Sequence, residues 1–339
     1  MASSTLHSKS GVPKLALRLV VATIGTWAAS AAYTLWLSPD VKFLAAAGHI
    51  KQDYARKMTR EHREKCVVFG GSSGLFSIDG ERMLARHDQP TVNMSLHAGC
   101  GAKTITEWAL SEVNPGDTLV VALEPFLLSS EVELTMIGTQ FCWAMHSPQW
   151  LDGVIEPRPS SISGSLFALR PGAYHAVTLC GKIASRRPLF RYAVSNIHPS
   201  GWVQTEVRLE FGSSAEPTTM SSSARLLLGN LSEWCRARQV RVCYAMPMAW
   251  AAPKDIQTLQ RKNAGFLWEV SQLIPVLEDR RLGANSDLGL FSDTNLHLNT
   301  NGVVMRTDEF AAQLRAWRMW KPAELLFLAT NGAAAPAPK

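Results

Sequence analysis

Two short segments, far apart in the chain, carry the residue types that serine-based acyl transfer needs. In the first, Ser72 follows Gly70 and Gly71 directly after the apolar run 66–69. Small neighbours in a tight turn at the end of a buried strand let a substrate carbonyl approach the hydroxyl. Backbone N–H groups at the start of the next helix could then stabilise an oxyanion. Alone, the run is a weak signal, and no lysine follows it as a phosphate-binding P-loop requires.

The second segment holds an acid and a histidine four residues apart, Asp293 and His297, between a short apolar run and the last predicted helix. One loop can thereby deliver an imidazole together with the carboxylate that fixes its tautomer. A lone histidine is usually structural. A serine turn after the first strand combined with an Asp–His loop after the last strand is much more specific, and it predicts that the three side chains meet.

Alternating strand-like and helix-like stretches predict the elements that would position these residues. Apolar runs predict strands at 66–69, 90–94, 118–123, 239–245 and 288–291, and longer stretches predict helices at 105–113, 224–238, 254–281 and 301–317. The alternation indicates βαβ units and a central parallel sheet of about five strands in an α/β domain spanning 66–320. Such sheets bind ligands at the carboxyl ends of their strands.

A long interval after the third predicted strand interrupts this alternation. We interpret residues 127–225 as an insertion or lid over the carboxyl ends of the strands. Its aromatic residues could stack on sugar rings or fill a small core of its own. The interval contains three tryptophans and a basic patch: Trp143, Trp150, Trp202, Lys182, Arg186 and Arg187.

The N-terminal residues 1–40 include a stretch that could cross a membrane. No charge lies between Arg18 and Asp40, and a bilayer core needs about 20 apolar residues. We favour an uncleaved anchor with a cytoplasmic N-terminus and a periplasmic body in a bacterium. The alternatives are a secretory signal cut near residues 29–31 and a buried helix of a soluble domain. Residues 41–65, rich in charge, predict a solvated neck helix, and 321–339 read as a C-terminal tail.

Composition excludes several classes of protein. The chain has 339 residues, of which 46% are hydrophobic and 18% charged, so it is not intrinsically disordered. A net charge of +6 without a basic cluster interleaved with aromatics argues against nucleic acid as a partner. The six cysteines are scattered, with no C-x-x-C pair, and read as buried thiols or as one or two disulfides. Neither a metal site nor a cofactor is predicted.

The two chemistry-bearing segments resemble those of the SGNH (GDSL-type) hydrolase superfamily. Residues 68–72, Val-Phe-Gly-Gly-Ser, match its first block, with Gly71 in place of the usual Asp. The match is closer to the Gly-Gly-Ser-x-x-x-Phe variant of membrane-anchored exopolysaccharide (cellulose- and alginate-type) and teichoic-acid acylation proteins. Their last block often reads Asp-Thr…His-Leu-Asn…Gly, as residues 293–302 do. The resemblance covers 65–127 and 235–320 in outline.

The resemblance implies a flavodoxin-like three-layer sandwich with Ser72 as nucleophile, His297 as base and Asp293 as the orienting carboxylate. It also implies that the backbone N–H groups of Ser72 and Gly99 line an oxyanion hole, with Ser95 as the next candidate. The family's third block normally supplies an Asn. This chain has Glu124 there, which would repel an oxyanion unless it is protonated or turned away.

Two functions of different classes follow from the resemblance. The first is a periplasmic O-acetyltransferase or acetylesterase acting on an exopolysaccharide such as cellulose, partnered by a multi-spanning membrane acyltransferase. The second is a weak or inactive relative that binds polysaccharide or scaffolds a synthase or secretion complex. The retained Ser72, Asp293 and His297 favour the first, and the missing Asn favours the second. His97 could approach the site or be a core or loop histidine.

Overall fold

A four-stranded parallel sheet forms the centre of the computed structural model, which describes residues 11–131, 133–155, 165–170, 173–186, 191–207, 210–215, 217 and 219–319. Its strands are β1 (Cys66–Gly70), β2 (Thr91–Asn93), β3 (Thr118–Ala122) and β4 (Arg241–Tyr244), in the order β2-β1-β3-β4. All three pairings are parallel. The order equals that of the first four strands of a 2-1-3-4-5 doubly wound sheet. The predicted α/β fold with a central parallel sheet is confirmed.

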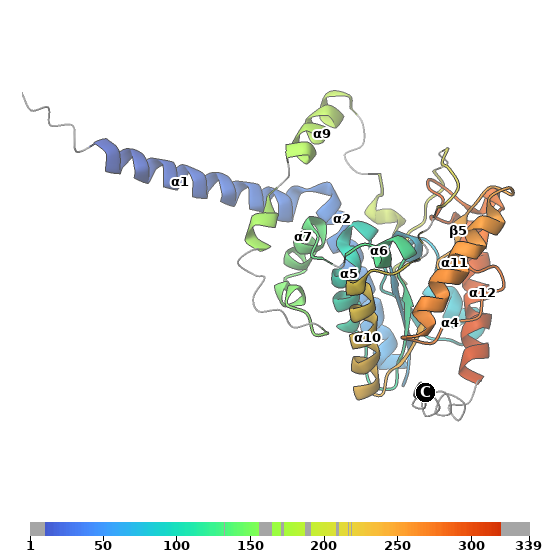
Figure 1. Cartoon of the computed structure of the whole chain (residues 1–339). Helices are drawn as coiled ribbons and strands as arrows, with labels where there is room; N and C mark the ends of the chain where they lie inside the picture. Colours follow the sequence, from blue (N-terminus) through green and yellow to red (C-terminus); the bar gives the residue numbers. More distant parts are fainter. Residues whose placement is uncertain are drawn as a thin grey trace, which may run out of the picture.

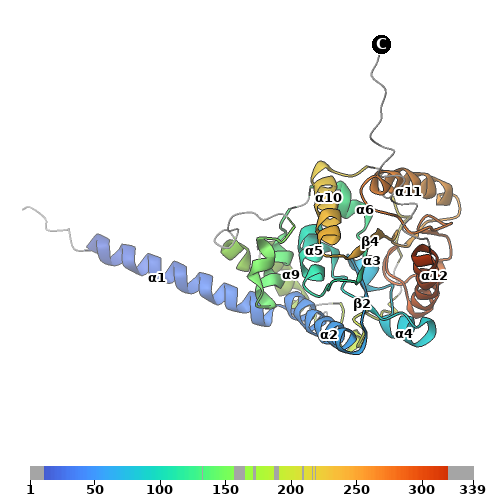
Figure 2. The same ribbon diagram turned by 90° about the horizontal axis from the view of Figure 1, so that it is seen from below.

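Helices cover both faces of the sheet because its central strands are apolar on both sides. Val67 and Phe69 of β1 face a core built with α2 (Pro39–Glu61), α5 (Gly101–Leu110) and α10 (Ser222–Ala237). Val68 faces the opposite core, built with α4 (Gly80–His87) and α12 (Thr300–Met319). Figure 1 and Figure 2 show α5 and α10 on one side of the sheet and α4 and α12 on the other.

The fifth strand expected at 288–291 is not a strand. Leu288–Leu290 form a 3-10 turn, η6, which begins where Asp287 accepts the N–H of Gly289. A single parallel bridge, Tyr244 to Val276, extends the sheet beyond β4 instead. Pro275 lacks a backbone N–H and cannot continue a ladder, so this edge stays one bridge long. The same proline lies beyond α11 (Ile256–Ser271), a helix that ends ten residues before the expected 281.

A second, two-stranded parallel sheet carries the chain to the Asp–His segment. It pairs β5 (Ala249–Trp250) with β6 (Ala284–Asn285). The N–H of Trp250 donates to the carbonyl of Asn295 at 2.8 Å, which ties this sheet to the loop. The loop is closed by an antiparallel bridge between Phe291 and Leu298. Its conformation is therefore fixed from two sides before α12 begins.

The N-terminal helix α1 (Gly11–Ala32) continues through a π-helical turn, η1 (Tyr33–Leu37). Residues 13–37 form a helix long and apolar enough to cross a membrane, and only 6% of its most apolar window is buried. Figure 1 shows α1 projecting away from the body. The last turn is different, since η1 contacts both α2 and α7 (Met136–Ala144) and buries Thr34.

The prediction of a solvated neck helix at 41–65 is wrong in one respect. It is helical, but α2 packs along the body and buries Phe43, Ala47 and Met58 completely or nearly so. Lys51 lies on this buried face, where its Nζ donates to the carbonyls of Asn93 (2.7 Å) and Gly201 (2.5 Å). The buried face of α2 contains small residues and one lysine instead of a continuous row of large apolar side chains. The apolar face is therefore hard to recognise in the sequence, where the charged residues dominate.

The insertion contains short helices, and two of its three tryptophans, Trp150 and Trp202, face inward, whereas Phe167 is exposed. Trp150 stacks on Phe141 and meets the edge of Trp108, while Trp202 stacks on His198. Both Trp150 and Trp202 are buried, so they fill core space rather than offering a sugar platform. The helical pieces are α6 (Pro125–Ser129), α7, η3 (Pro148–Leu151), η4 (Leu166–Leu169), α9 (Ala173–Ala184) and η5 (Val194–Asn196). Arg187 and the tail at 321–339 lie outside the described residues.

All six cysteines lie in the described part of the chain, and none of them forms a disulfide. Five are buried, and Cys180 on α9 is exposed. Of the two alternatives left open by their spacing, the structure has the free thiols.

Candidate active site

The turn that presents Ser72 is tightly packed against its neighbours. Ser72 begins the short helix α3 (Ser72–Leu75), directly after β1 and Gly71. A Cβ added to Gly70 would lie 2.2 Å from the carbonyl oxygen of Ala122, and one added to Gly71 would lie 2.2 Å from Glu124 Oε2. At position 70 the obstacle is backbone and only glycine fits, whereas at position 71 a side chain would have to displace the Glu124 carboxylate; the serine is held at the carboxyl end of β1.

Glu124 is hydrogen-bonded to the backbone of this turn. It follows β3, is fully buried, and accepts the N–H of Gly71 through Oε2 (2.9 Å) and that of Ser73 through Oε1 (2.7 Å). Burial raises the pKa of Glu124, while these N–H groups act in the opposite direction. The carboxylate takes the space that a side chain at position 71 would need. The two departures from the family pattern, Gly71 and Glu124, thus fit one another.

Asp293 and His297 form a buried hydrogen-bonded pair. The distance from His297 Nδ1 to Asp293 Oδ1 is 2.8 Å, and the two residues are 6% and 4% exposed. The loop that carries them is held by the N–H of Ser292 on the carbonyl of His297 at 2.9 Å and by the N–H of His297 on Thr294 Oγ1 at 3.1 Å. A carboxylate in this position orients the ring and selects the tautomer.

The imidazole lies beside the helix that begins with Ser72. The ring of Phe76 stacks on His297, with centroids 4.2 Å apart and planes 24° apart. Phe76 donates its N–H to the carbonyl of Ser72 at 3.1 Å, one turn along the chain. Within the described residues Ser72 Oγ makes no hydrogen bond to His297. Catalytic hydrogen bonds are often long without substrate and tighten when it binds.

Sequence reasoning missed two residues of the insertion that contact Asp293. Arg191 Nη1 lies 3.0 Å from Asp293 Oδ2, and Tyr192 donates its hydroxyl to the same oxygen at 2.8 Å. Burial by itself would raise the pKa of Asp293, but the hydrogen bonds from His297, Tyr192 and Arg191 hold it well below its usual range. These contacts span 102 and 101 residues. No local pattern in the sequence signals them.

The backbone N–H groups expected to bind an oxyanion are mostly engaged elsewhere. The N–H of Gly99 donates to His97 Nδ1 at 3.0 Å, and that of Ser95 donates to Asn93 Oδ1 at 3.0 Å. In the part of the chain that the structure describes, the Ser72 N–H makes no hydrogen bond. The bond from Gly99 also leaves the proton of a neutral His97 on Nε2. Burial, and then the charge of His297, lower the pKa of His97.

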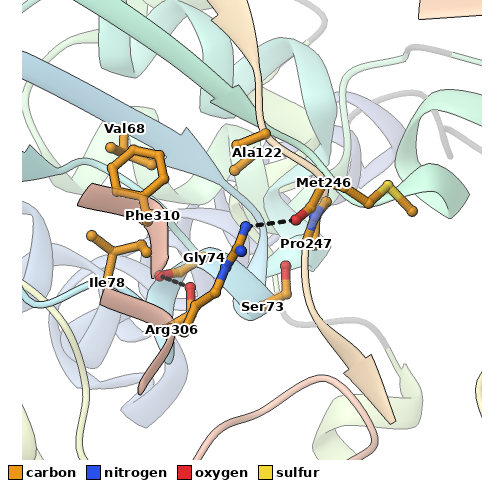
Figure 3. Close-up of a pocket in the computed structure, with 11 residues that line it drawn as sticks. Val68, Ser73, Gly74, Ile78, Ala122, Met246, Pro247, Arg306 and Phe310 are labelled. Atoms are coloured by element: carbon orange, nitrogen blue, oxygen red, sulfur yellow. Dashed lines mark hydrogen bonds between the residues drawn. The ribbon is translucent and has the colours of Figure 1, made fainter. Parts of the chain in front are cut away.

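A pocket opens behind the turn, away from the Asp–His pair. Ser73 and Gly74 line it together with Arg306 of α12, whose Nη2 donates to the carbonyl of Met246 at 2.9 Å (Figure 3). Neither Ser72 nor His297 lines this pocket. Burial lowers the pKa of Arg306. The pocket therefore belongs to the packing of α12 under the sheet. No group of His, Cys, Asp and Glu able to hold a metal ion occurs among residues that the structure describes.

Comparison with family models, with curated proteins and with solved structures finds no match. The geometry of the site and the resemblance of the two blocks are therefore the support for a function.

Proposed function

We propose that this chain is a membrane-anchored, periplasmic serine acyl-transfer enzyme of the SGNH type. It would act as an O-acetyltransferase or acetylesterase on a bacterial exopolysaccharide such as cellulose. The observation that supports this most is the buried Asp293–His297 pair, whose ring stacks on Phe76, the motif aromatic one turn after Ser72. These residues come from opposite ends of the domain sequence, and packing alone does not require an acid and a histidine here.

In the proposed mechanism, Ser72 Oγ attacks the carbonyl carbon of an acyl ester while His297 Nε2 takes the hydroxyl proton. The tetrahedral intermediate collapses, and the leaving oxygen departs with that proton, leaving an acyl ester on Ser72. A sugar hydroxyl or water then attacks the acyl carbon. His297 takes its proton and returns one to Ser72 Oγ as the acyl group leaves. Asp293 keeps the Nδ1 proton in place and stabilises the transient imidazolium.

The proposed cellular location and substrate class are supported by the N-terminal helix and by the resemblance, and not by the geometry of the site. One helix long and apolar enough to span a membrane precedes the body, and the resemblance connects such anchored proteins with polysaccharide acylation. We propose the bacterial inner membrane for α1 and a multi-spanning acyltransferase as the partner that supplies acyl groups. Tethering both to one membrane raises the effective concentration of the second site to about millimolar.

Labelling with a fluorophosphonate tests the nucleophile. The full-length chain should be labelled at Ser72, and Ser72→Ala should abolish labelling. Ser73→Ala is the matched control, because it keeps the backbone N–H that Glu124 accepts and changes only the neighbouring hydroxyl. Equal labelling of Ser72→Ala and wild type would show that the serine assignment is wrong.

A second candidate function, a non-catalytic polysaccharide-binding or scaffold subunit, is favoured by one observation. The N–H groups of Gly71, Ser73, Ser95 and Gly99 all have acceptors within the protein. Loss of one oxyanion donor costs about 2.7–4 kcal/mol in serine enzymes. Polymer acetylation in strains carrying wild type or His297→Ala separates the two, because a scaffold predicts no difference between them.

A further inference from the structure

Two distant parts of the chain, the Asp–His loop and the insertion, meet at the Asp293 carboxylate. His297 of the same loop takes one oxygen, Oδ1, and Arg191 and Tyr192 of the insertion share the other, Oδ2. Ser292 Oγ also donates to Asp293 Oδ1, at 3.3 Å. The Asp293 side chain is fully buried, whereas that of Arg191 is 49% exposed. The insertion therefore supplies the hydrogen-bond donors to Asp293 Oδ2, the oxygen that does not face His297 Nδ1.

We infer that Arg191 and Tyr192 are positioning residues that hold Asp293 against His297 and set how readily the imidazole takes up a proton. This inference rests on the proposed function, because it assigns these side chains to the working base of that same site. Neither residue belongs to the two blocks on which the resemblance to acylation proteins stands.

The contacts around Asp293 fix the orientation of its carboxylate. A carboxylate with one oxygen on the imidazole and the other on two donors cannot rotate without breaking three contacts. Tyr192 is itself fixed, since its ring lies 5.0 Å from that of Phe76 and 6.0 Å from that of Phe43 on α2. Its hydroxyl is also 3.3 Å from His297 Nδ1. Tyr192 thus docks the insertion on the body and directs one hydroxyl into the Asp–His pair.

The positive charge of Arg191 affects the attraction between Asp293 and a protonated His297. The guanidinium of Arg191 offsets part of the negative charge of Asp293, and a protonated imidazole is then attracted less strongly. His97, in the segment after β2, interacts electrostatically with His297 of the pair, and Asp40 of α2 interacts electrostatically with His97. Glu124 lies under the neighbouring turn with its oxygens on Gly71 and Ser73. Among these groups, Arg191 is the cation in direct contact with Asp293.

Removing the Arg191 charge should therefore let the imidazole keep its proton to a higher pH. In Arg191→Gln, the acidic limb of the labelling rate against pH should move upward by roughly half a pH unit, since the side chain is half exposed. Arg191→Lys should restore most of the wild-type profile. Tyr192→Phe should lower the labelling rate several-fold, with a smaller shift of the limb. Arg170→Gln, an exposed arginine of the same insertion, should match wild type.

Proton uptake is measured separately on the full chain in detergent, labelled with 15N-histidine and carrying Ser72→Ala. The ring resonance of His297, assigned with His297→Gln, should titrate at higher pH in Arg191→Gln than with Arg191 present. Unchanged titration and an unchanged labelling profile would overturn the inference. A shifted titration, together with no labelling of the chain that retains Ser72, would keep the positioning role and reject the acyl-transfer function. Near-UV circular dichroism checks that each variant is folded.

Discussion

The turn beneath Ser72 shows how two unusual residues explain each other. A protein with a side chain at position 71 has no room for the Glu124 carboxylate, and without Glu124 the N–H groups of Gly71 and Ser73 would be buried without an acceptor. An unsatisfied buried N–H costs about 1–3 kcal/mol. The sequence alone suggested repulsion between Glu124 and an oxyanion. The structure gives the carboxylate a supporting role for the backbone of the turn.

Gly71→Ala should therefore displace Glu124. We expect the free energy of unfolding to fall by about 1–3 kcal/mol and Ser72 labelling to fall by about tenfold or more. Gly229→Ala on α10 is the matched control, because nothing lies within 4 Å of a Cβ there. That control should raise stability by up to about 1 kcal/mol through helix propensity. Chemical denaturation measures both, and equal effects of the two substitutions would contradict the packing argument.

Prediction of the site from the sequence worked where the residues are local to one motif. Asp293 and His297 are four residues apart, and the structure pairs them directly. Arg191 and Tyr192 reach Asp293 from about a hundred residues away, through packing that no spacing rule reports. The N–H of Gly99, an expected oxyanion donor, binds the neighbouring His97 instead. The roles of Ser72, Asp293 and His297 stay predictions.

At the scale of elements, α2 is the clearest case of tertiary packing overriding composition. Its buried stripe includes Lys51, whose aliphatic stem extends the apolar face while Nζ reaches two carbonyls. Burial lowers the pKa of Lys51 well below its usual value. The strands at 66–69, 118–123 and 239–245 were easier to predict, because continuous apolar runs bounded by turns have few other interpretations. The edge at Val276 was missed because Pro275 breaks the run.

Lys51 gives stability a pH dependence with a definite sign. The folded chain binds this proton more weakly than the unfolded chain does, so stability increases with pH from the lowered folded value up to about 10.4. Relative to Lys51→Met, wild type should gain stability between pH 7 and pH 10, as measured by urea denaturation. Lys57→Met, at an exposed position of the same helix, is the control. The stability difference between wild type and this variant should not change with pH. A wild-type advantage that shrinks with rising pH would contradict a buried neutral amine.

At the scale of the whole molecule, α1 projects from the body, and the described segments around the central sheet form a layered α/β domain. Leu19, Val20 and Ile24 of α1 are more than half exposed, and a protein surface in water rarely carries such a patch. Its last turn, however, is held by α2 and α7. The alternation of apolar runs and helices sufficed to predict the sheet. The docking of η1 and of the insertion depends on contacts between distant segments.

Charges placed in α1 should release the chain from the membrane without disturbing the body. Val20→Arg combined with Ile24→Arg should shift full-length protein from the pellet to the supernatant after a carbonate wash, since each arginine costs about 2.5–3.5 kcal/mol in a spanning helix. Leu226→Arg, an exposed leucine of α10, is the control and should stay in the pellet. Wild type found soluble without its first ~30 residues would instead indicate a cleaved signal. Protease added to spheroplasts tests whether the body is periplasmic.

The joint between η1 and α2 has a mechanical consequence. Ser38 donates its N–H to the carbonyl of Tyr33, Pro39 opens α2 at once, and Phe43 already touches Tyr192. Only residues 38–42 separate η1 from Phe43, which packs against the Tyr192 that contacts Asp293, and these residues are helical or hydrogen-bonded. With α1 in the membrane as proposed, this rigid connection gives the proposed catalytic pair a fixed height above the bilayer. The proposed polysaccharide substrate would have to approach the site at that height, because the residues between η1 and Phe43 form no flexible linker.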